Sequence, residues 1–240
     1  MDNPLRDMYA TLYNRPTIEL AVYIASQALS GQLMAYLNYG GPTGSAKDAL
    51  AEGMLALAVE KGQLRPGQQV IEASSGTFAV ALTIAARHSG HPVHLVMPGT
   101  VMPDRQRYLN GLGAKVTLTN YVYGRDGTVR RAKELASELG GYFVNYFSTD
   151  NNAEFHRRVT GPALFKATGG NIDALVAGVG SGGTITGAGE YPKGWAGNIW
   201  TVAVQPYESQ SLTGGYSGRR GLAGIGAGLL PDDYNPYVVD

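Results

Sequence analysis

The sequence contains no cysteine among its 240 residues. Disulfide bonds, thiolate metal ligands and a catalytic thiol are therefore excluded. Net charge is absent as well, because 19 lysines and arginines balance 19 aspartates and glutamates. No basic tract stands out, so we expect no nucleic-acid partner. No apolar run reaches the length of a bilayer span, and the first residues lack the layout of a signal peptide. These observations favour a cytoplasmic protein that does not bind membranes.

Glycine, in contrast, is abundant, with 34 residues. A collagen-like sequence is excluded because the glycines have no period. They fall mainly after apolar runs, where a strand turns into a helix, and phosphate-binding loops occur at such positions. The alternation of strands and helices also has the length of βαβ units, which predicts a parallel sheet covered on both faces.

The pattern of apolar runs and turn residues predicts two α/β lobes with a cleft between them, preceded by a polar arm at residues 1–15. We expect strands at 17–24, 32–38, 69–72, 93–98, 115–119, 142–144, 174–177 and 199–205. We expect helices at 49–61, 78–88, 103–112, 127–139 and 154–168.

The segment 41–48 (GPTGSAKD) places Lys47 behind a tight loop of small residues and directly before a helical pattern. A lysine held there can form a Schiff base with an aldehyde cofactor, because a partly desolvated lysine loses its proton readily. The alternative is an ordinary helix start, with Ser45 as the N-cap and Lys47 and Asp48 in solvent.

Two further glycine-rich segments follow Lys47, at 72–77 (EASSGT) and 178–187 (GVGSGGTITG). In this order the three segments resemble the fold type II pyridoxal-phosphate enzymes, and within them the cysteine synthase (O-acetylserine sulfhydrylase) and cystathionine β-synthase group. Residues 156–162 (HRRVTGP) and 224–231 (GIGAGLLP) belong to the same resemblance. The implied fold is like that of the tryptophan synthase β-subunit: two parallel-sheet α/β lobes with a pyridoxal 5'-phosphate cleft between them.

The resemblance also implies a division of the chain into two domains. A smaller α/β domain at 48–150 would close over the substrate. A larger cofactor domain would combine 1–47 with 151–240.

Residue roles follow from the same resemblance. Lys47 would hold pyridoxal phosphate covalently and then act as the base at the substrate α-carbon. Backbone N–H groups of the glycine loop would bind the cofactor phosphate at a helix N-terminus, although such a loop alone can also be a turn. The residues implied for this phosphate site are Gly180, Ser181, Gly182, Gly183 and Thr184.

The substrate carboxylate would be bound by Ser74, Ser75, Gly76 and Thr77. The alternative is a helix N-cap, where serine and threonine are common. Thr77 stands where the family has an asparagine that bonds the phenolic oxygen of the cofactor, so it would replace that contact with a shorter side chain.

Two aromatic residues also depart from the family pattern. Phe78 replaces a threonine, and we interpret it as core packing of the helix that begins there. Tyr146 replaces a glutamine near the substrate, so it would bind the substrate and alter the preference for it. A buried tyrosine at the lobe junction is the alternative.

The remaining ionisable residues are assigned no catalysis. The segment 156–158 is interpreted as a solvated helix face or an interlobe contact, and Asp48 as a local cap or ion-pair partner. No metal site is predicted, because solvated positions explain His88, His91 and His94 better than a shared metal does.

Residues 237–240 are interpreted as part of a strand. The family continues beyond this point with a further strand, helices and a loop whose hydroxyl bonds the pyridine nitrogen. We therefore expect a C-terminally short chain with exposed apolar sheet, low activity and association into a homodimer.

The function implied by the resemblance is pyridoxal-phosphate-dependent β-replacement on an O-activated serine, such as O-acetylserine reacting with sulfide to give cysteine and acetate. The partners would be a small amino-acid substrate and a small nucleophile. Cysteine desulfhydrase, cystathionine synthase and diaminopropionate synthase activities would use the same residues. A degenerate, non-catalytic paralogue that binds a partner remains the alternative from another class. A nucleotide-binding domain is disfavoured, because no Gly-x-Gly-x-x-Gly loop follows the first strand.

Overall fold

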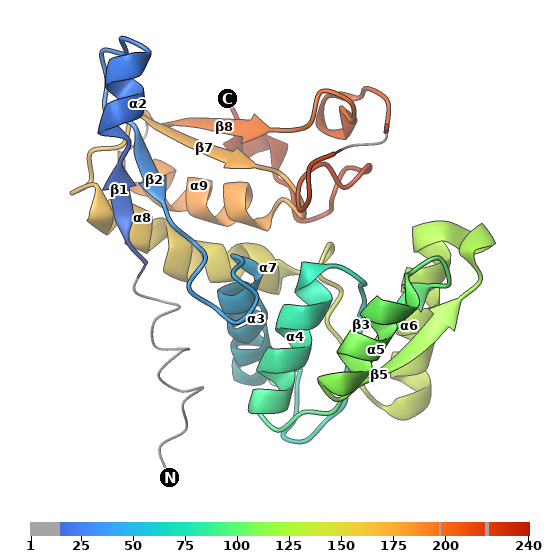
Figure 1. The fold of residues 1–240 in the computed structure, drawn as a ribbon. Coiled ribbons are helices and arrows are strands. Elements are labelled where there is room, and N and C mark those ends of the chain that lie inside the picture. The colour runs from blue at the N-terminus through green and yellow to red at the C-terminus, as the bar shows by residue number, and fades with distance from the viewer. Residues whose placement is uncertain (1–14, 197, 219–220) are drawn as a thin grey trace.

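The computed structural model describes residues 15–196, 198–218 and 221–240 (Figure 1). The predicted arm, apart from Arg15, lies outside the described residues. Within them, no helix is both long and apolar enough to cross a membrane. The strands are β1 (Thr17–Glu19), β2 (Met34–Tyr36), β3 (Val70–Ala73), β4 (Val93–Pro98), β5 (Ala114–Thr119), β6 (Tyr142–Phe143), β7 (Ala174–Gly178) and β8 (Trp200–Val204). The α-helices are α2 (Ala21–Ser26), α3 (Lys47–Glu60), α4 (Thr77–His88), α5 (Pro103–Gly111), α6 (Gly124–Leu139), α7 (Asp150–Phe155), α8 (Gly161–Ala167) and α9 (Gly183–Ala196).

The larger sheet is parallel, with the strand order β5-β4-β3-β6. Alternating side chains of its strands face opposite sides, and both sides are covered. On one side Val70 and Leu95 pack into a core shared with α3 and α4. On the other side Ile71 and Val96 pack against α6. The predicted parallel sheet with two covered faces is confirmed here.

The smaller sheet pairs β7 with β8 in parallel, and α9 lies along it (Figure 1). Thr201 is fully buried on the face toward α9, where Gly189 leaves room for it. The residues that pair on the opposite face are exposed, with Val176 at 61% and its partner Val202 at 38%. Among the described residues, this sheet is therefore covered on one face, in contrast to the prediction.

The helix predicted at 154–168 is interrupted in its middle. It begins earlier, at α7, continues as a π-helical turn over His156–Thr160, and resumes as α8. Pro162 explains the interruption, because it has no N–H to donate and its ring collides with the carbonyl one turn before it. The wider turn directly before Gly161 absorbs both effects.

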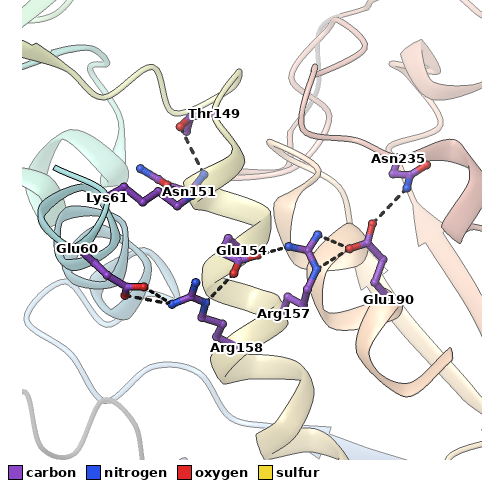
Figure 2. Close-up of polar contacts among 9 residues, drawn as sticks. All are labelled: Glu60, Lys61, Thr149, Asn151, Glu154, Arg157, Arg158, Glu190 and Asn235. Carbon is purple, nitrogen blue, oxygen red and sulfur yellow. Dashed lines mark hydrogen bonds and ion pairs between the residues drawn. The ribbon is translucent and has the colours of Figure 1, made fainter. Parts of the chain in front are cut away.

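A chain of ion pairs joins α3 to α7 and α9 along this interrupted helix (Figure 2). Arg158 contacts Glu60 of α3 at 2.8 Å and Glu154 of α7 at 2.6 Å. Arg157 pairs with Glu154 and with Glu190 of α9. The interlobe-contact interpretation is therefore supported for Arg158, whose partner Glu60 lies in the segment 48–150, whereas both partners of Arg157 lie in the same segment, 151–240, as Arg157 itself.

Two strand predictions near the chain ends are wrong. The segment 17–24 divides into β1 and the helix α2, and β1 pairs antiparallel with β2. Its apolar residues fit a short strand and a helical turn equally well, so periodicity could not separate them. At the other end, Pro236–Val238 is a 3-10 turn, and the Asp240 N–H donates to the Thr201 carbonyl at 3.0 Å.

Candidate functional site

A cavity of about 980 Å³ lies beside the carboxyl end of the larger sheet. Its wall includes eight of the predicted site residues: Lys47, Ser74, Ser75, Gly76, Thr77, Tyr146, Gly180 and Ser181. Within the described part of the chain, Gly182, Gly183 and Thr184 are outside this lining. The three glycine-rich segments therefore meet around one space, although they are far apart in the sequence.

The loop before Lys47 is held by Asp48. Its carboxylate is buried and accepts hydrogen bonds from the Thr43 N–H at 3.1 Å, the Thr43 hydroxyl at 2.8 Å and the Ser45 N–H at 3.3 Å. Gly41 is required beside it, because a Cβ there would lie 2.5 Å from the Asp48 side chain. Asp48 thus caps this loop locally, as predicted, and the alternative that placed it in solvent is wrong.

Lys47 is the first residue of α3, and its side chain is half-buried on the cavity wall. Burial lowers the pKa of its amine below the usual lysine value. The neutral amine is therefore easier to reach than in a surface lysine. That property suits both Schiff-base formation and proton abstraction.

Residues 74–77, between β3 and the first turn of α4, carry hydroxyl groups that make no hydrogen bond to the described part of the protein. The helix has Gly76 as its N-cap, with no side-chain capping bond. Among the described residues, the hydroxyls of Ser74, Ser75 and Thr77 have no hydrogen-bond partner. The N-cap interpretation of these hydroxyls is thus not supported, and the segment offers free hydroxyls and helix-start N–H groups to an anion.

The glycine loop between β7 and α9 packs against the segment 224–228. A Cβ at Gly180 would lie 2.3 Å from the Gly224 carbonyl oxygen, and the Gly226 N–H donates to the Val179 carbonyl at 2.8 Å. Ala223, Gly224, Ile225 and Ala227 consequently join the cavity wall. The family signature at 224–231 was noticed in the sequence, but no local feature assigned it to the site.

Asn152 connects the predicted segments from behind the cavity wall. Its side-chain nitrogen lies 3.0 Å from the Tyr146 carbonyl oxygen, 2.8 Å from the Ser181 hydroxyl and 3.0 Å from an Asp233 carboxylate oxygen. Gly183 must be glycine, because a Cβ there would lie 2.0 Å from the Asn152 amide oxygen. Sequence reasoning missed Asn152, since an asparagine within a helix carries no motif.

The two aromatic departures from the family pattern contact each other. Phe78 and Tyr146 stack with ring centroids 4.0 Å apart, and both line the cavity. Tyr146 is 6% exposed, and burial raises the pKa of its hydroxyl to about 12. It is therefore a buried tyrosine that also faces the site, so the two interpretations of this residue are compatible. Phe78 packs in the core, as predicted.

For His156, the interpretation as part of a solvated helix face is wrong. This residue is 2% exposed, and its ring nitrogens contact the Thr160 hydroxyl at 2.8 Å and the Thr184 hydroxyl at 3.1 Å. Burial, aided by the charge of Lys47, lowers its pKa to about 3, so the ring is neutral. A neutral imidazole thereby fixes Thr184 at the start of α9.

His91 and His94 were also predicted in solvent, and both are buried. His91 contacts the Gln68 carbonyl at 2.9 Å, and His94 contacts the Thr117 hydroxyl at 2.8 Å. Each hydrogen bond satisfies one ring nitrogen inside the sheet lobe, whereas Nδ1 of His94 is buried without a hydrogen-bond partner among the described residues.

Comparison with known proteins decides the family. The family of pyridoxal-phosphate dependent enzymes matches residues 11–235. The chain belongs to this family. It is 33% identical to a cysteine synthase of Staphylococcus aureus over 99% of this chain and 76% of that one. A cysteine synthase 3 of Caenorhabditis elegans is 34% identical over 95% and 67% of the two chains.

Solved structures agree with this assignment. The cysteine synthase of Entamoeba histolytica superimposes with a TM-score of 0.87 at 30% identity, over 100% of this chain and 73% of that one. An O-ureido-L-serine synthase gives a TM-score of 0.85 at 26% identity, over 97% and 73%. The predicted fold type II architecture is confirmed.

The residues of the cavity fit pyridoxal phosphate. An amine with a lowered pKa faces the same space as the glycine turn that precedes α9. A helix start with small residues suits the phosphate, and the amine suits the aldehyde. The cofactor of this family member is pyridoxal 5'-phosphate, as predicted.

Proposed function

We propose that this chain catalyses β-replacement on an O-activated serine, such as the conversion of O-acetylserine and sulfide to cysteine and acetate. The observation that carries the proposal is Lys47, with its lowered pKa, in one cavity with the free hydroxyls of residues 74–77. The similarity to cysteine synthases over nearly the whole chain supports the same reaction.

Pyridoxal phosphate, when bound, supplies an aldehyde for the substrate amine and an electron sink for the charge that develops at the α-carbon. Lys47 would hold it and then accept the α-proton at Nζ, which the lowered pKa favours. Gly180 and Ser181, with the loop to Thr184, would bind the phosphate where α9 begins. This loop also contains Gly182, whose φ of +90° suits glycine, and Gly183.

Ser74, Ser75, Gly76 and Thr77 would bind the substrate carboxylate at the start of α4. Thr77 would also approach the phenolic oxygen of the cofactor. Tyr146, stacked on Phe78, would limit the space beside the substrate. We further propose that the domain at 48–150 closes over the substrate, while 1–47 and 151–240 hold the cofactor.

Two further expectations concern the oligomeric state and the cellular location of the protein. A homodimer would bury exposed apolar residues such as Val176 and Trp200, which are 61% and 64% exposed. The sequence-based prediction of a cytoplasmic protein that acts on small metabolites is consistent with this activity.

The test compares the protein with its Lys47→Ala variant, and with Lys115→Ala as a control on the exposed edge of β5. Protein loaded with pyridoxal phosphate should absorb in the visible, and borohydride should fix the cofactor on a peptide containing Lys47. It should form cysteine from O-acetylserine and sulfide, and Lys47→Ala should lose this activity by at least about 1,000-fold. Bound cofactor without turnover would favour the non-catalytic paralogue, and no bound cofactor would refute the catalytic proposal.

A further inference from the structure

Two arginines that the proposed reaction does not use line the same cavity as Lys47. Arg105 lies in the first turn of α5, and Arg125 lies in the first turn of α6. Each helix follows a strand of the parallel sheet, so both begin at its carboxyl edge, where ligands bind in such sheets. Their positions therefore follow from the topology.

Among the described residues, neither guanidinium group forms an ion pair with a carboxylate, although Arg125 interacts electrostatically with the buried Glu72. The paired arginines are Arg107, Arg130, Arg131, Arg157 and Arg158. Arg125 instead lies 4.5 Å from the centre of the Phe147 ring. Phe147 in turn packs edge-on against Tyr146, with ring centroids 4.8 Å apart. The row of aromatic rings that begins at Phe78 thus ends at a guanidinium group.

The cavity is also cationic as a whole. Its charged lining residues are Lys47, Arg105 and Arg125, and the described lining contains no aspartate or glutamate. Although the chain has equal numbers of acidic and basic residues, the wall of this cavity carries only basic ones. Such a site concentrates anions and binds oxyanions through charge-assisted hydrogen bonds.

The other anions of the proposed reaction have other binding groups. The cofactor phosphate is assigned to the loop before α9, and the substrate carboxylate to residues 74–77. Neither the phosphate nor the carboxylate therefore requires the two arginines. Thr100 lines the same region and adds a hydroxyl.

We propose that Arg105 and Arg125 bind an oxyanion carried by the β-substituent of the substrate. The preferred substrate class would be serine esterified with an acid that keeps a negative charge, as in a phosphate ester. This inference rests on the proposed function. Lys47 Nζ takes the α-proton, the Cβ–O bond breaks, and its electron pair leaves with the oxygen as inorganic phosphate. The sulfide electron pair forms the Cβ–S bond, and the proton returns to the α-carbon, giving cysteine.

The experiment measures kcat/KM of the cofactor-loaded protein for O-phospho-L-serine and O-acetyl-L-serine at saturating sulfide. The variants are Arg105→Gln, Arg125→Gln and the double variant. Arg107→Gln, on the same helix as Arg105 but paired with Asp104, is the matched control. Each cavity variant should lower kcat/KM for the phosphate ester about tenfold, and the double variant about 100-fold. The value for O-acetylserine should change less than about threefold, and Arg107→Gln should alter neither.

The proposal is overturned if the double variant changes the ratio of the two kcat/KM values by less than tenfold. An anionic thiol, mercaptoacetate, in place of sulfide tests the other source of negative charge. A loss confined to that arm would assign the arginines to the nucleophile and overturn the leaving-group proposal. If neither ester is turned over, the proposed function fails. The Kd of O-phospho-L-serine, measured by calorimetry, then still decides this inference, because only a weaker Kd in the double variant supports it.

Discussion

The sheets β5-β4-β3-β6 and β7–β8 are both parallel and both apolar in sequence, yet they are buried differently. Leu95 and Val96, neighbours in β4, are both fully buried, because α4 and α6 cover opposite faces. In β8, Thr201 is fully buried and its neighbour Val202 is 38% exposed. The apolar sequence of a strand thus indicates which side chains can be buried. Whether they are buried depends on which faces of the sheet the helices cover.

The largest contrast should come from matched truncations in the two sheets. Leu95→Ala removes a fully buried side chain and should cost about 2–5 kcal/mol of unfolding free energy. Val202→Ala removes exposed methyl groups and should cost less than about 1 kcal/mol. Urea denaturation of the apoprotein measures both values. Equal losses would show that the outer face of β8 is covered in solution.

The second contrast uses pH. Burial raises the pKa of Glu72, in β3, to about 7. A carboxyl that holds its proton more tightly in the folded state stabilises the protein fully below pH 4.5, and this stabilisation is lost as the pH rises to about 7. Its contribution should decline by at most about 1.4 kcal/mol per pH unit.

Glu72→Gln should remove that decline, because the amide does not titrate. The measurement is unfolding free energy against pH for both proteins. Asp233, whose pKa burial raises from 3.8 to about 7, gives the parallel case beside α9. Its Asp233→Asn variant should flatten the profile in the same direction. An unchanged slope in Glu72→Gln would mean that Glu72 is ionised in the fold throughout this range.

How much the sequence predicts differs between the same two regions. The strands and helices between residues 69 and 139 were placed within three residues, because each βαβ unit has a strong apolar strand and a clear turn. The π-helical turn could not be placed, since it depends on how Pro162 shifts the hydrogen bonds before it. The lysine and the loops that line the cavity were predicted from motifs and the family resemblance that these carry. Asn152 and His156 were not, because only packing brings them to those loops.

A third prediction separates the two hydroxyls held by His156. Thr184→Val removes the contact at the start of α9 and should weaken pyridoxal phosphate binding about tenfold. Thr160→Val removes the contact at the other ring nitrogen and should lower stability by about 1–3 kcal/mol without that loss of affinity. Cofactor titration and thermal unfolding distinguish the two effects. Equal cofactor affinities in both variants would refute a role for Thr184 at the phosphate.

The smallest effect should come from the ion pairs that join the two regions (Figure 2). Arg158 bridges Glu60 and Glu154, but its side chain is 46% exposed, so solvent screens the interaction. Arg158→Ala should therefore cost only about 0.2–1 kcal/mol, and less at high salt. Arg157→Ala should cost more, because both of its partners, Glu154 and Glu190, are less exposed than Glu60, and both carboxylates lose this partner. The two unfolding free energies, measured in low and high salt, provide the comparison. A larger, salt-independent loss in Arg158→Ala would show that the junction between α3 and α7 depends on this ion pair more than on the apolar packing beneath it.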